Sequence, residues 1–215
     1  MVPQLSTPLA TGVAAPEVPL AGKERILRKG QDQFVARGYA DVTMQDVADA
    51  VGLTKAAVYY HFGDKEGLFE AVFFAEMERV AAGIATELAV ASGFRTELEG
   101  VARFLLLTGG SSLGRLIADL DRYVGEERRR ELLNRVPHPY AVIRPAFVRA
   151  VASGAIRPVD LDVVIPLYFA MIFGQIRSEA HGRPAAAPPA ALAKSIADVT
   201  IDGIGTRDER VGENS

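Results

Sequence analysis

The chain has 215 residues, of which 49% are hydrophobic and 24% are charged, so one large domain, or a small domain joined to a larger one, is expected to pack a core. The absence of cysteine excludes disulfide scaffolds, thiolate metal sites and cysteine nucleophiles, and the three histidines are too far apart for a metal-ligand spacing. A net charge of −3 argues mildly against a dedicated nucleic-acid binder, so a DNA-binding claim must rest on a motif.

The first 22 residues carry prolines at positions 3, 8, 16 and 19 and no basic residue. Dense prolines prevent a helix, so we predict a disordered arm over 1–22. Arms that enter a DNA minor groove use arginine or lysine, and none occurs before Lys23. This arm also lacks the pattern of a signal peptide, and no apolar run in the chain reaches the roughly 18 residues of a membrane span, so we predict a cytoplasmic protein.

Helical periodicity begins at Lys23, and Gly38 is expected to end this first helix. Thr43 stands at the N-cap position of a second helix, with Asp46 completing a capping-box pattern. Gly52 ends that helix, and Thr54 is placed to cap a third one over 55–61. A fourth, longer helix is predicted to follow, capped by a second aspartate, Asp64.

The remainder of the chain also has the pattern of helices. We predict them at about 95–108, 112–123, 126–151, 160–180 and 189–204, with proline breaking the third at "VPHPY" and the polar residues 206–215 forming a flexible tail. The stretch "VVIPLYFAMIFGQI", residues 163–176, is too apolar for a helix with one exposed face. We therefore expect it to be buried on several sides, either within one chain or, with 189–204, in a four-helix dimer interface.

The most informative stretch is "TMQDVADAVGLTKAAVYYHF", residues 43–62. Two short helices flank Gly52, which permits a sharp turn, and Ala48 permits their close approach. This arrangement is typical of a helix-turn-helix, in which the second helix enters the major groove and leads with its N-terminal residues. Here those residues are "TKAA", 54–57, whose small alanines allow the helix to approach the bases.

With the helix before it and "GDKEGLFEAV" after it, this stretch resembles the tetracycline-repressor (TetR) family of bacterial transcription regulators, over about residues 24–72. The resemblance implies an all-α fold: a helix-turn-helix DNA-binding domain over 23–70 and a helical ligand-binding and dimerisation domain over 71–205. Carried over position by position, it implies phosphate, backbone or base contacts by Thr43, Gln45, Thr54, Lys55, Ala56, Tyr59, Tyr60, His61 and Lys65. It also implies a double-stranded DNA operator, a homodimer and an unidentified small-molecule effector, with no membrane.

Direct base readout is expected to be sparse, because among positions 55–57 only Lys55 donates side-chain hydrogen bonds. Residues 23–70 hold seven Lys or Arg and eight Asp or Glu, so the module is near neutral. Phosphate binding must then rely on clustered cations together with hydroxyls and helix termini: Lys23, Arg25, Arg28, Lys29, Lys55 and Lys65. We predict a modest salt dependence, below roughly ten released counterions per dimer.

Simpler interpretations compete with each of these assignments. The two tyrosines would be core filler, although helical spacing puts Val58 and Phe62 on the inner face and leaves Tyr59 largely on the other. Most aromatic residues of the C-terminal part would be core, and most of its polar residues would be surface. The candidates for lining an effector pocket are Arg103, Phe104, His138, Tyr140, Arg144, Phe147, Tyr168 and Gln175.

The sequence thus predicts a dimeric, ligand-responsive transcription regulator, most simply a repressor that binds a near-palindromic operator. An activator, or a regulator that needs its ligand to bind DNA, has the same pattern. An enzyme on a helical bundle is a remote alternative, because no metal-ligand, phosphate-loop or catalytic-triad pattern occurs. We expect no catalytic residue, metal or cofactor.

Overall fold

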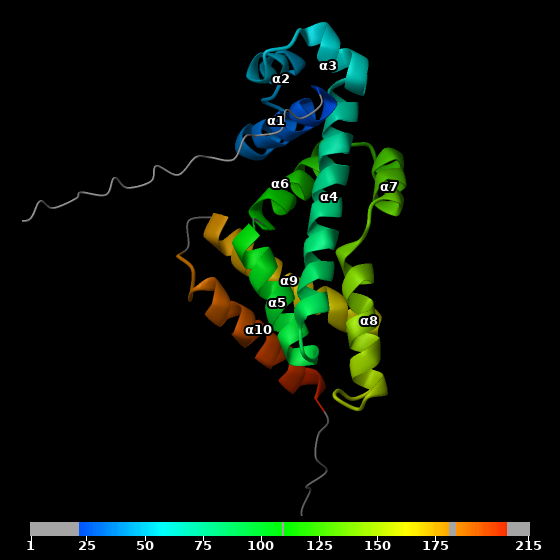
Figure 1. The fold of residues 1–215 in the computed structure, drawn as a ribbon, viewed down its shortest axis with the longest axis vertical. Coiled ribbons are helices and arrows are strands. Elements are labelled where there is room, and N and C mark those ends of the chain that lie inside the picture. The colour runs from blue at the N-terminus through cyan, green and yellow to red at the C-terminus, as the bar shows by residue number, and fades with distance from the viewer. Residues whose placement is uncertain (1–21, 109, 181–183, 206–215) are drawn as a thin grey trace, which may run out of the picture.

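The computed structural model describes residues 22–108, 110–180 and 184–205, and every regular element within these ranges is an α-helix. The all-α class predicted from the sequence is therefore confirmed. Of the predicted arm, only Gly22 belongs to the described residues, and the predicted tail lies outside them. In chain order the helices are α1 (Gly22–Arg37), α2 (Met44–Val51), α3 (Lys55–Phe62), α4 (Lys65–Val90), α5 (Phe94–Thr108), α6 (Gly110–Tyr123), α7 (Glu126–Arg135), α8 (Pro139–Ala152), α9 (Leu161–Ala180) and α10 (Pro189–Ile204) (Figure 1).

Local capping explains why the N-terminal helices begin and end where they do. The Thr43 hydroxyl accepts the Asp46 N–H at 3.1 Å, and the Asp46 carboxylate accepts the Thr43 N–H at 2.7 Å, which is the predicted capping box. Thr54 likewise accepts the Ala57 N–H at 3.2 Å at the start of α3. Gly52 adopts φ 67°, the left-handed conformation that glycine reaches without strain, and so ends α2 sharply.

The helix α4 joins the two ends of the molecule. Helices α1, α2 and α3 lie together at one end, and α4 leads from them into the bundle formed by the later helices (Figure 1). It begins at the cap of Asp64, whose carboxylate accepts the Gly67 N–H at 2.7 Å, and continues unbroken for 26 residues. The predicted boundary between 70 and 71 thus falls inside one helix, and the division into two domains stays a prediction.

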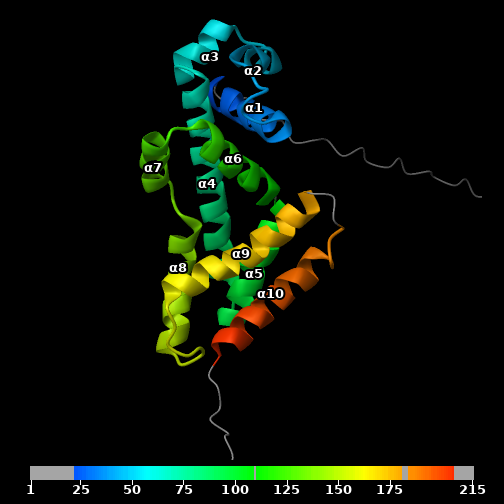
Figure 2. The same cartoon turned by 180° about the vertical axis from the view of Figure 1, so that it is seen from behind.

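The C-terminal helices follow the predicted pattern closely. The expected break at "VPHPY" separates α7 from α8, whereas Pro145 lies inside α8 without ending it. Helix α10 runs beside α5, and α9 crosses next to both α8 and α10 (Figure 2). The core of this bundle is built from fully buried aromatic side chains, among them Phe147, Tyr168 and Phe169.

The apolar helix α9 departs from the prediction. Its window Leu161–Ser178 has a mean hydropathy of 1.3 but is only 28% buried, and Val163 and Leu167 are 52% and 59% exposed. The expectation that this stretch is buried on several sides is therefore wrong for the single chain, because α10 packs mainly along α5 and leaves one face of α9 open. The apolar run 163–176 is shorter than a membrane span, as expected, but α9 extends beyond it at both ends. By length and composition alone α9 is long and apolar enough, a test that core helices of soluble proteins also pass.

Candidate nucleic-acid interface

The helix α3 presents the predicted recognition surface. Its one fully buried side chain, Val58, anchors it, whereas Lys55 and Ala56 are exposed, Tyr59 is 42% exposed and Tyr60 is 86% exposed. The two tyrosines are thus surface residues, as predicted. Contiguous exposed apolar patches mark contact surfaces for other molecules, so these adjacent tyrosines make this face of α3 a candidate contact surface.

The start of α3 is prepared for an anion. Its first turn contains no acidic residue, so no carboxylate of α3 itself compensates the positive end of the helix dipole. The Thr54 oxygen accepts the Ala57 N–H, so its own hydroxyl hydrogen remains available to a phosphate. The Lys55 ammonium lies 5.7 Å from the centre of the Tyr59 ring, which places the only α3 lysine beside the exposed tyrosine.

The predicted contacts of α2 have partners within the protein. The Gln45 amide nitrogen donates to Asp49 Oδ1 at 2.7 Å, so the Gln45 carbonyl oxygen is its unoccupied end. The Thr43 hydroxyl donates to Asp46 Oδ2 at 2.7 Å, and this bond, with the one from the Thr43 N–H, lowers the pKa of the Asp46 carboxyl. A phosphate at Thr43 would share that hydroxyl hydrogen with an ionised carboxylate.

The end of α3 carries the aromatic pair Tyr60 and His61. Their rings meet edge to face at 5.3 Å, and both side chains are exposed. Gly22, the first residue of α1, lies close to the imidazole, since a Cβ added to this glycine would be 4.0 Å from His61 Nε2. The contact of Tyr60 and His61 with phosphates stays a prediction.

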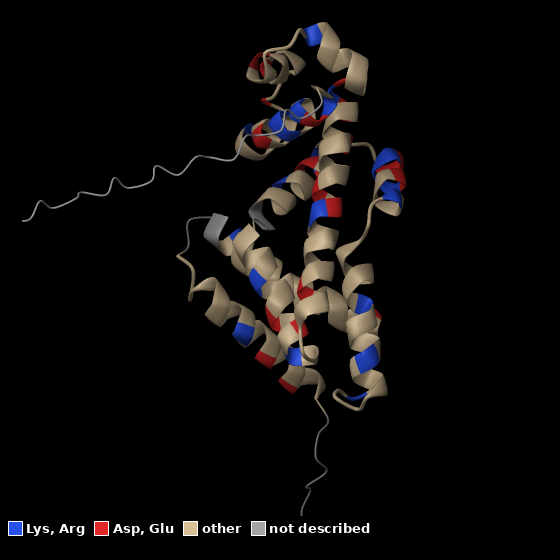
Figure 3. Ribbon diagram, in the orientation of Figure 1, with Lys and Arg blue, Asp and Glu red and all other residues tan. Residues whose placement is uncertain are grey.

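Lys and Arg positions occur along α1 and at the start of α3 (Figure 3). Some of these side chains have partners within the protein, and others form no ion pair with the described residues. The Arg25 guanidinium donates to the carbonyl oxygen of Val51 at 2.6 Å, so it joins α1 to the end of α2. Lys29 pairs with Asp32 at 3.1 Å. Three further cations, Lys23, Arg28 and Lys55, form no ion pair with the described residues. Among the cations predicted to bind phosphate, Arg25 is the one whose guanidinium is used to hold two helices together.

Among the residues predicted to contact DNA, Lys65 has a hydrogen bond, a ring contact and nearby carboxylates within the protein. Its ammonium donates to the carbonyl oxygen of Ala40 at 3.2 Å and lies 4.4 Å from the centre of the Tyr39 ring. Burial lowers the pKa of Lys65, and the nearby carboxylates of Asp41 and Asp119 oppose that shift. In the sequence Tyr39 is only a loop residue after Gly38. The one signal that could have singled it out is a large aromatic side chain in a short polar connection.

The described elements therefore form a capped helix pair, Met44–Val51 and Lys55–Phe62, packed on α1 with an exposed second helix. Residues 26–72 match the family model of "Bacterial regulatory proteins, tetR family". Over this segment the chain therefore matches the tetR family.

Known proteins agree with this assignment. The HTH-type transcriptional repressor AcnR of Corynebacterium glutamicum is 32% identical over 92 residues, which are 43% of this chain and 48% of AcnR. The HTH-type transcriptional regulator SrpR of Pseudomonas putida is 25% identical over 145 residues, 66% of each protein. The chain thus spans about half the length of the first of these curated relatives and 66% of the second.

A solved structure extends the likeness to the whole fold. A TetR family transcription regulator from Marinobacter aquaeolei superposes with a TM-score of 0.67 over 86% of this chain and 96% of its own, at 18% sequence identity. At this identity the similarity concerns the fold alone. The order of a short N-terminal group of helices and a C-terminal helical bundle is therefore shared with that structure.

The eight residues predicted to line an effector pocket are spread over the C-terminal bundle. Four of them belong to one chain of aromatic contacts that also includes Phe169, with successive ring centres 4.4 to 6.4 Å apart: His138, Tyr140, Phe147 and Tyr168. Phe147 and Tyr168 are fully buried, and the Tyr168 hydroxyl donates to the carbonyl oxygen of Leu98 at 2.6 Å. Phe147 and Tyr168 thus belong to the core of the bundle, whereas Tyr140 is half-buried and His138 is exposed. Contact of these four side chains with an effector stays a prediction.

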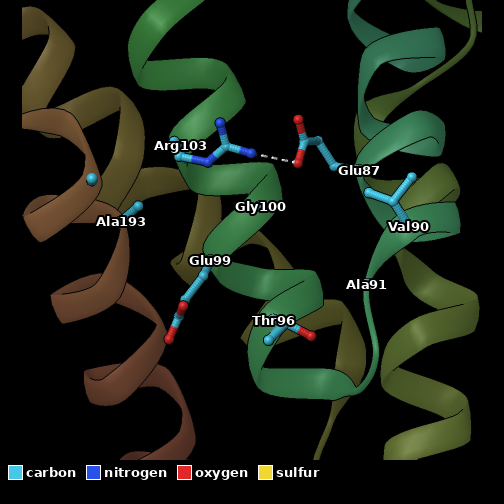
Figure 4. Close-up of a pocket in the computed structure, with 9 residues that line it drawn as sticks. Glu87, Val90, Ala91, Thr96, Glu99, Gly100, Arg103 and Ala193 are labelled. Atoms are coloured by element: carbon cyan, nitrogen blue, oxygen red, sulfur yellow. Dashed lines mark hydrogen bonds and ion pairs between the residues drawn. The ribbon is translucent and has the colours of Figure 1, made fainter.

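The other four candidates lie apart. Arg144 is exposed and pairs with Asp162 at 2.5 Å, Gln175 is half-buried on α9, and the Phe104 ring fills the space above Gly83 where α5 meets α4. Arg103 lines a cleft of about 310 Å³ between the end of α4, α5 and α10. There its guanidinium meets Glu87 at 3.0 Å, and the Glu99 side chain leaves α5 on the side of α10 (Figure 4).

Proposed function

We propose that this chain is a dimeric transcription repressor of the tetR family that binds DNA with α3 and responds to a small molecule. The observation that carries the proposal is the exposed face of α3, which holds Lys55, Ala56, Tyr59 and Tyr60 at one end of the molecule while Val58 anchors the helix. In such a dimer the two α3 helices would enter successive major grooves of a two-fold-related operator. The chain would act in the cytoplasm, where the chromosome lies, and would not be an enzyme.

Helices α9 and α10 supply the proposed dimer interface. Val163 and Leu167 lie one helical turn apart on α9, and Val199 on α10 is 60% exposed, so neighbouring helices offer uncovered aliphatic side chains. An apolar surface of this kind on a helix pair fits a self-complementary contact about a two-fold axis. A lipid-bound α9 is the competing arrangement.

The oligomeric state tests this interface. We expect the wild-type chain to sediment as a dimer and Leu167→Glu to sediment as a monomer, because a charge in an apolar interface is desolvated without a partner. The matched control is Val148→Glu, since Val148 is also 51% exposed but lies on α8. Monomeric wild-type protein, or recovery of the chain with membranes, contradicts the proposed interface.

DNA binding is tested by selection. The wild-type chain is used to recover duplexes from fragmented genomic DNA, and the recovered duplex is then titrated with Tyr59→Ala and Lys55→Ala. Both variants are expected to lose at least about tenfold in affinity, or 1.4 kcal/mol, while keeping the wild-type unfolding midpoint. Arg130→Ala on α7 is the control, because the Arg130 side chain is 66% exposed and its only ion pair among the described residues, with Glu126, lies within α7. Failure of the wild type to enrich any duplex contradicts the proposed function.

Repression and effector response need separate measurements. The operator recovered above is placed before a reporter gene, and we expect the chain to lower expression; increased expression assigns an activator instead. Metabolites and drugs are then screened for release of the chain from the duplex. A ligand that weakens DNA binding must, by linkage, bind more weakly to the DNA-bound chain.

A further inference from the structure

The Tyr39 side chain lies where three parts of the molecule meet. It stands between α1 and α2, and its ring stacks on Phe34 of α1 at 6.0 Å and meets Phe69 of α4 edge to face at 5.0 Å. The ring of Tyr123, the last residue of α6, stacks on it at 5.3 Å. Stacked and edge-to-face pairs of this kind stabilise the position of the ring that they share.

Helix α6 also holds the backbone of this turn. Asp119 Oδ2 accepts the Tyr39 N–H at 2.8 Å, a bond to a charged acceptor across 80 positions of sequence. The Arg115 guanidinium packs against Gly38, since a Cβ added there would lie 3.2 Å from it. Three residues of α6 spaced four positions apart, Arg115, Asp119 and Tyr123, thus face the same turn.

The Tyr39 ring also contacts Lys65. A lysine ammonium on an exposed helix start is normally a mobile, hydrated charge, and fixing its side chain costs rotamer entropy. Here the ring face of Tyr39 and the carbonyl oxygen of Ala40 already hold the ammonium, while the side chain stays half-exposed. One of its three N–H donors is used by Ala40, and the others are free for an oxygen anion.

We propose that Tyr39 is a positioning residue for DNA binding: it holds Lys65 in place for a phosphate, and Asp119 of α6 holds Tyr39. The proposal rests on the proposed function, because it concerns how the chain grips DNA. In this arrangement α6, a helix of the C-terminal bundle, holds Tyr39, and Tyr39 in turn holds the lysine that contacts DNA. A displacement of α6 that breaks the bond from Tyr39 to Asp119 would release Lys65 and weaken the DNA complex.

The first test is the salt dependence of binding to the duplex recovered by the wild-type chain. Each phosphate contact contributes about 0.9 to the slope of log affinity against log salt, so Lys65→Ala should lower the slope by about 2 per dimer. We expect Tyr39→Leu to lower the slope by nearly as much. Tyr39→Phe, which keeps the ring, should have the slope of the wild-type chain. In Lys65→Ala, adding Tyr39→Leu should change the slope no further. An unchanged slope in folded Tyr39→Leu overturns the proposal.

The second test separates the hydrogen bond of Asp119 from its charge. Asp119→Asn and Asp119→Ala both remove the carboxylate charge, but only the asparagine keeps an oxygen that accepts the Tyr39 N–H. We expect the alanine variant to bind the duplex about threefold to tenfold more weakly than the asparagine variant when Lys65 is present, and equally well in a Lys65→Ala background. A difference that persists without Lys65 overturns the relay. Absence of duplex binding by the wild type is a distinct outcome, which refutes the proposed function itself.

Discussion

Substitution of Gly52 tests the geometry on which the recognition helix depends. This glycine adopts φ 67° and ψ 33° between α2 and α3, and its N–H is hydrogen-bonded to the carbonyl oxygens of Ala48 and Asp49. A Cβ added to Gly52 would meet no heavy atom within 4 Å, so Gly52→Ala adds backbone strain without a steric clash. An L-residue in the left-handed region costs about 1–2 kcal/mol, and we expect the free energy of unfolding to fall by that amount.

The assay is urea unfolding. The control is a second glycine, whose replacement by alanine is expected to change the free energy of unfolding in the opposite direction. Gly114 lies exposed within α6, and a Cβ there also meets nothing within 4 Å, so Gly114→Ala should stabilise the chain by about 0.5–1 kcal/mol. Gly52→Asn should fall between wild type and Gly52→Ala, because asparagine tolerates this conformation better than alanine. A Gly52→Ala variant as stable as wild type refutes the assigned turn, and a loss above about 3 kcal/mol refutes the absence of a clash.

Three further predictions concern single side chains. Thr54→Ala should cost about 1 kcal/mol of unfolding free energy, whereas Thr54→Ser keeps the cap of α3; equal stability of all three chains contradicts the capping role. Glu76 is 1% exposed and accepts the Arg79 Nε–H at 2.8 Å. Glu76→Leu should therefore lower the free energy of unfolding in urea by about 1–3 kcal/mol, and Glu76→Gln should lower it by less. Burial lowers the pKa of His138 in the folded chain, so the unfolded chain binds more protons. The stability contributed by the neutral imidazole is therefore complete above the unfolded pKa of about 6.5. It is lost as the pH falls through the folded pKa. Between pH 7.5 and 5 the wild-type chain should therefore lose more unfolding free energy than His138→Asn, and parallel losses would contradict that shift.

Much of the N-terminal fold was predictable because its signals are local. The capping box of Thr43 and Asp46, the turn at Gly52 and the buried position of Val58 each depend on residues within about one helical turn, the range over which helix periodicity and capping act. The break between α7 and α8 was predictable for the same reason, since proline acts on its own helix.

The candidate site was predictable in its members but not in their partners. Exposure of Tyr59 and Tyr60 follows from helical spacing, yet nothing in the local pattern indicates that Arg25 donates to Val51 or that Gln45 donates to Asp49. These bonds consume hydrogen-bonding groups that the sequence alone offers to DNA. The predicted effector-binding set was the least determined, because buried aromatic side chains serve a core and a pocket equally well.

The sequence by itself determined the helices, their caps and the exposed face of the recognition helix, since each follows from the chemistry of neighbouring residues. Only the tertiary structure decided that α9 leaves Val163 and Leu167 uncovered, because that depends on α10 packing along α5. Only the tertiary structure brought Asp119 to Tyr39 and Tyr39 to Lys65, since contacts between residues far apart in the chain depend on how whole helices pack.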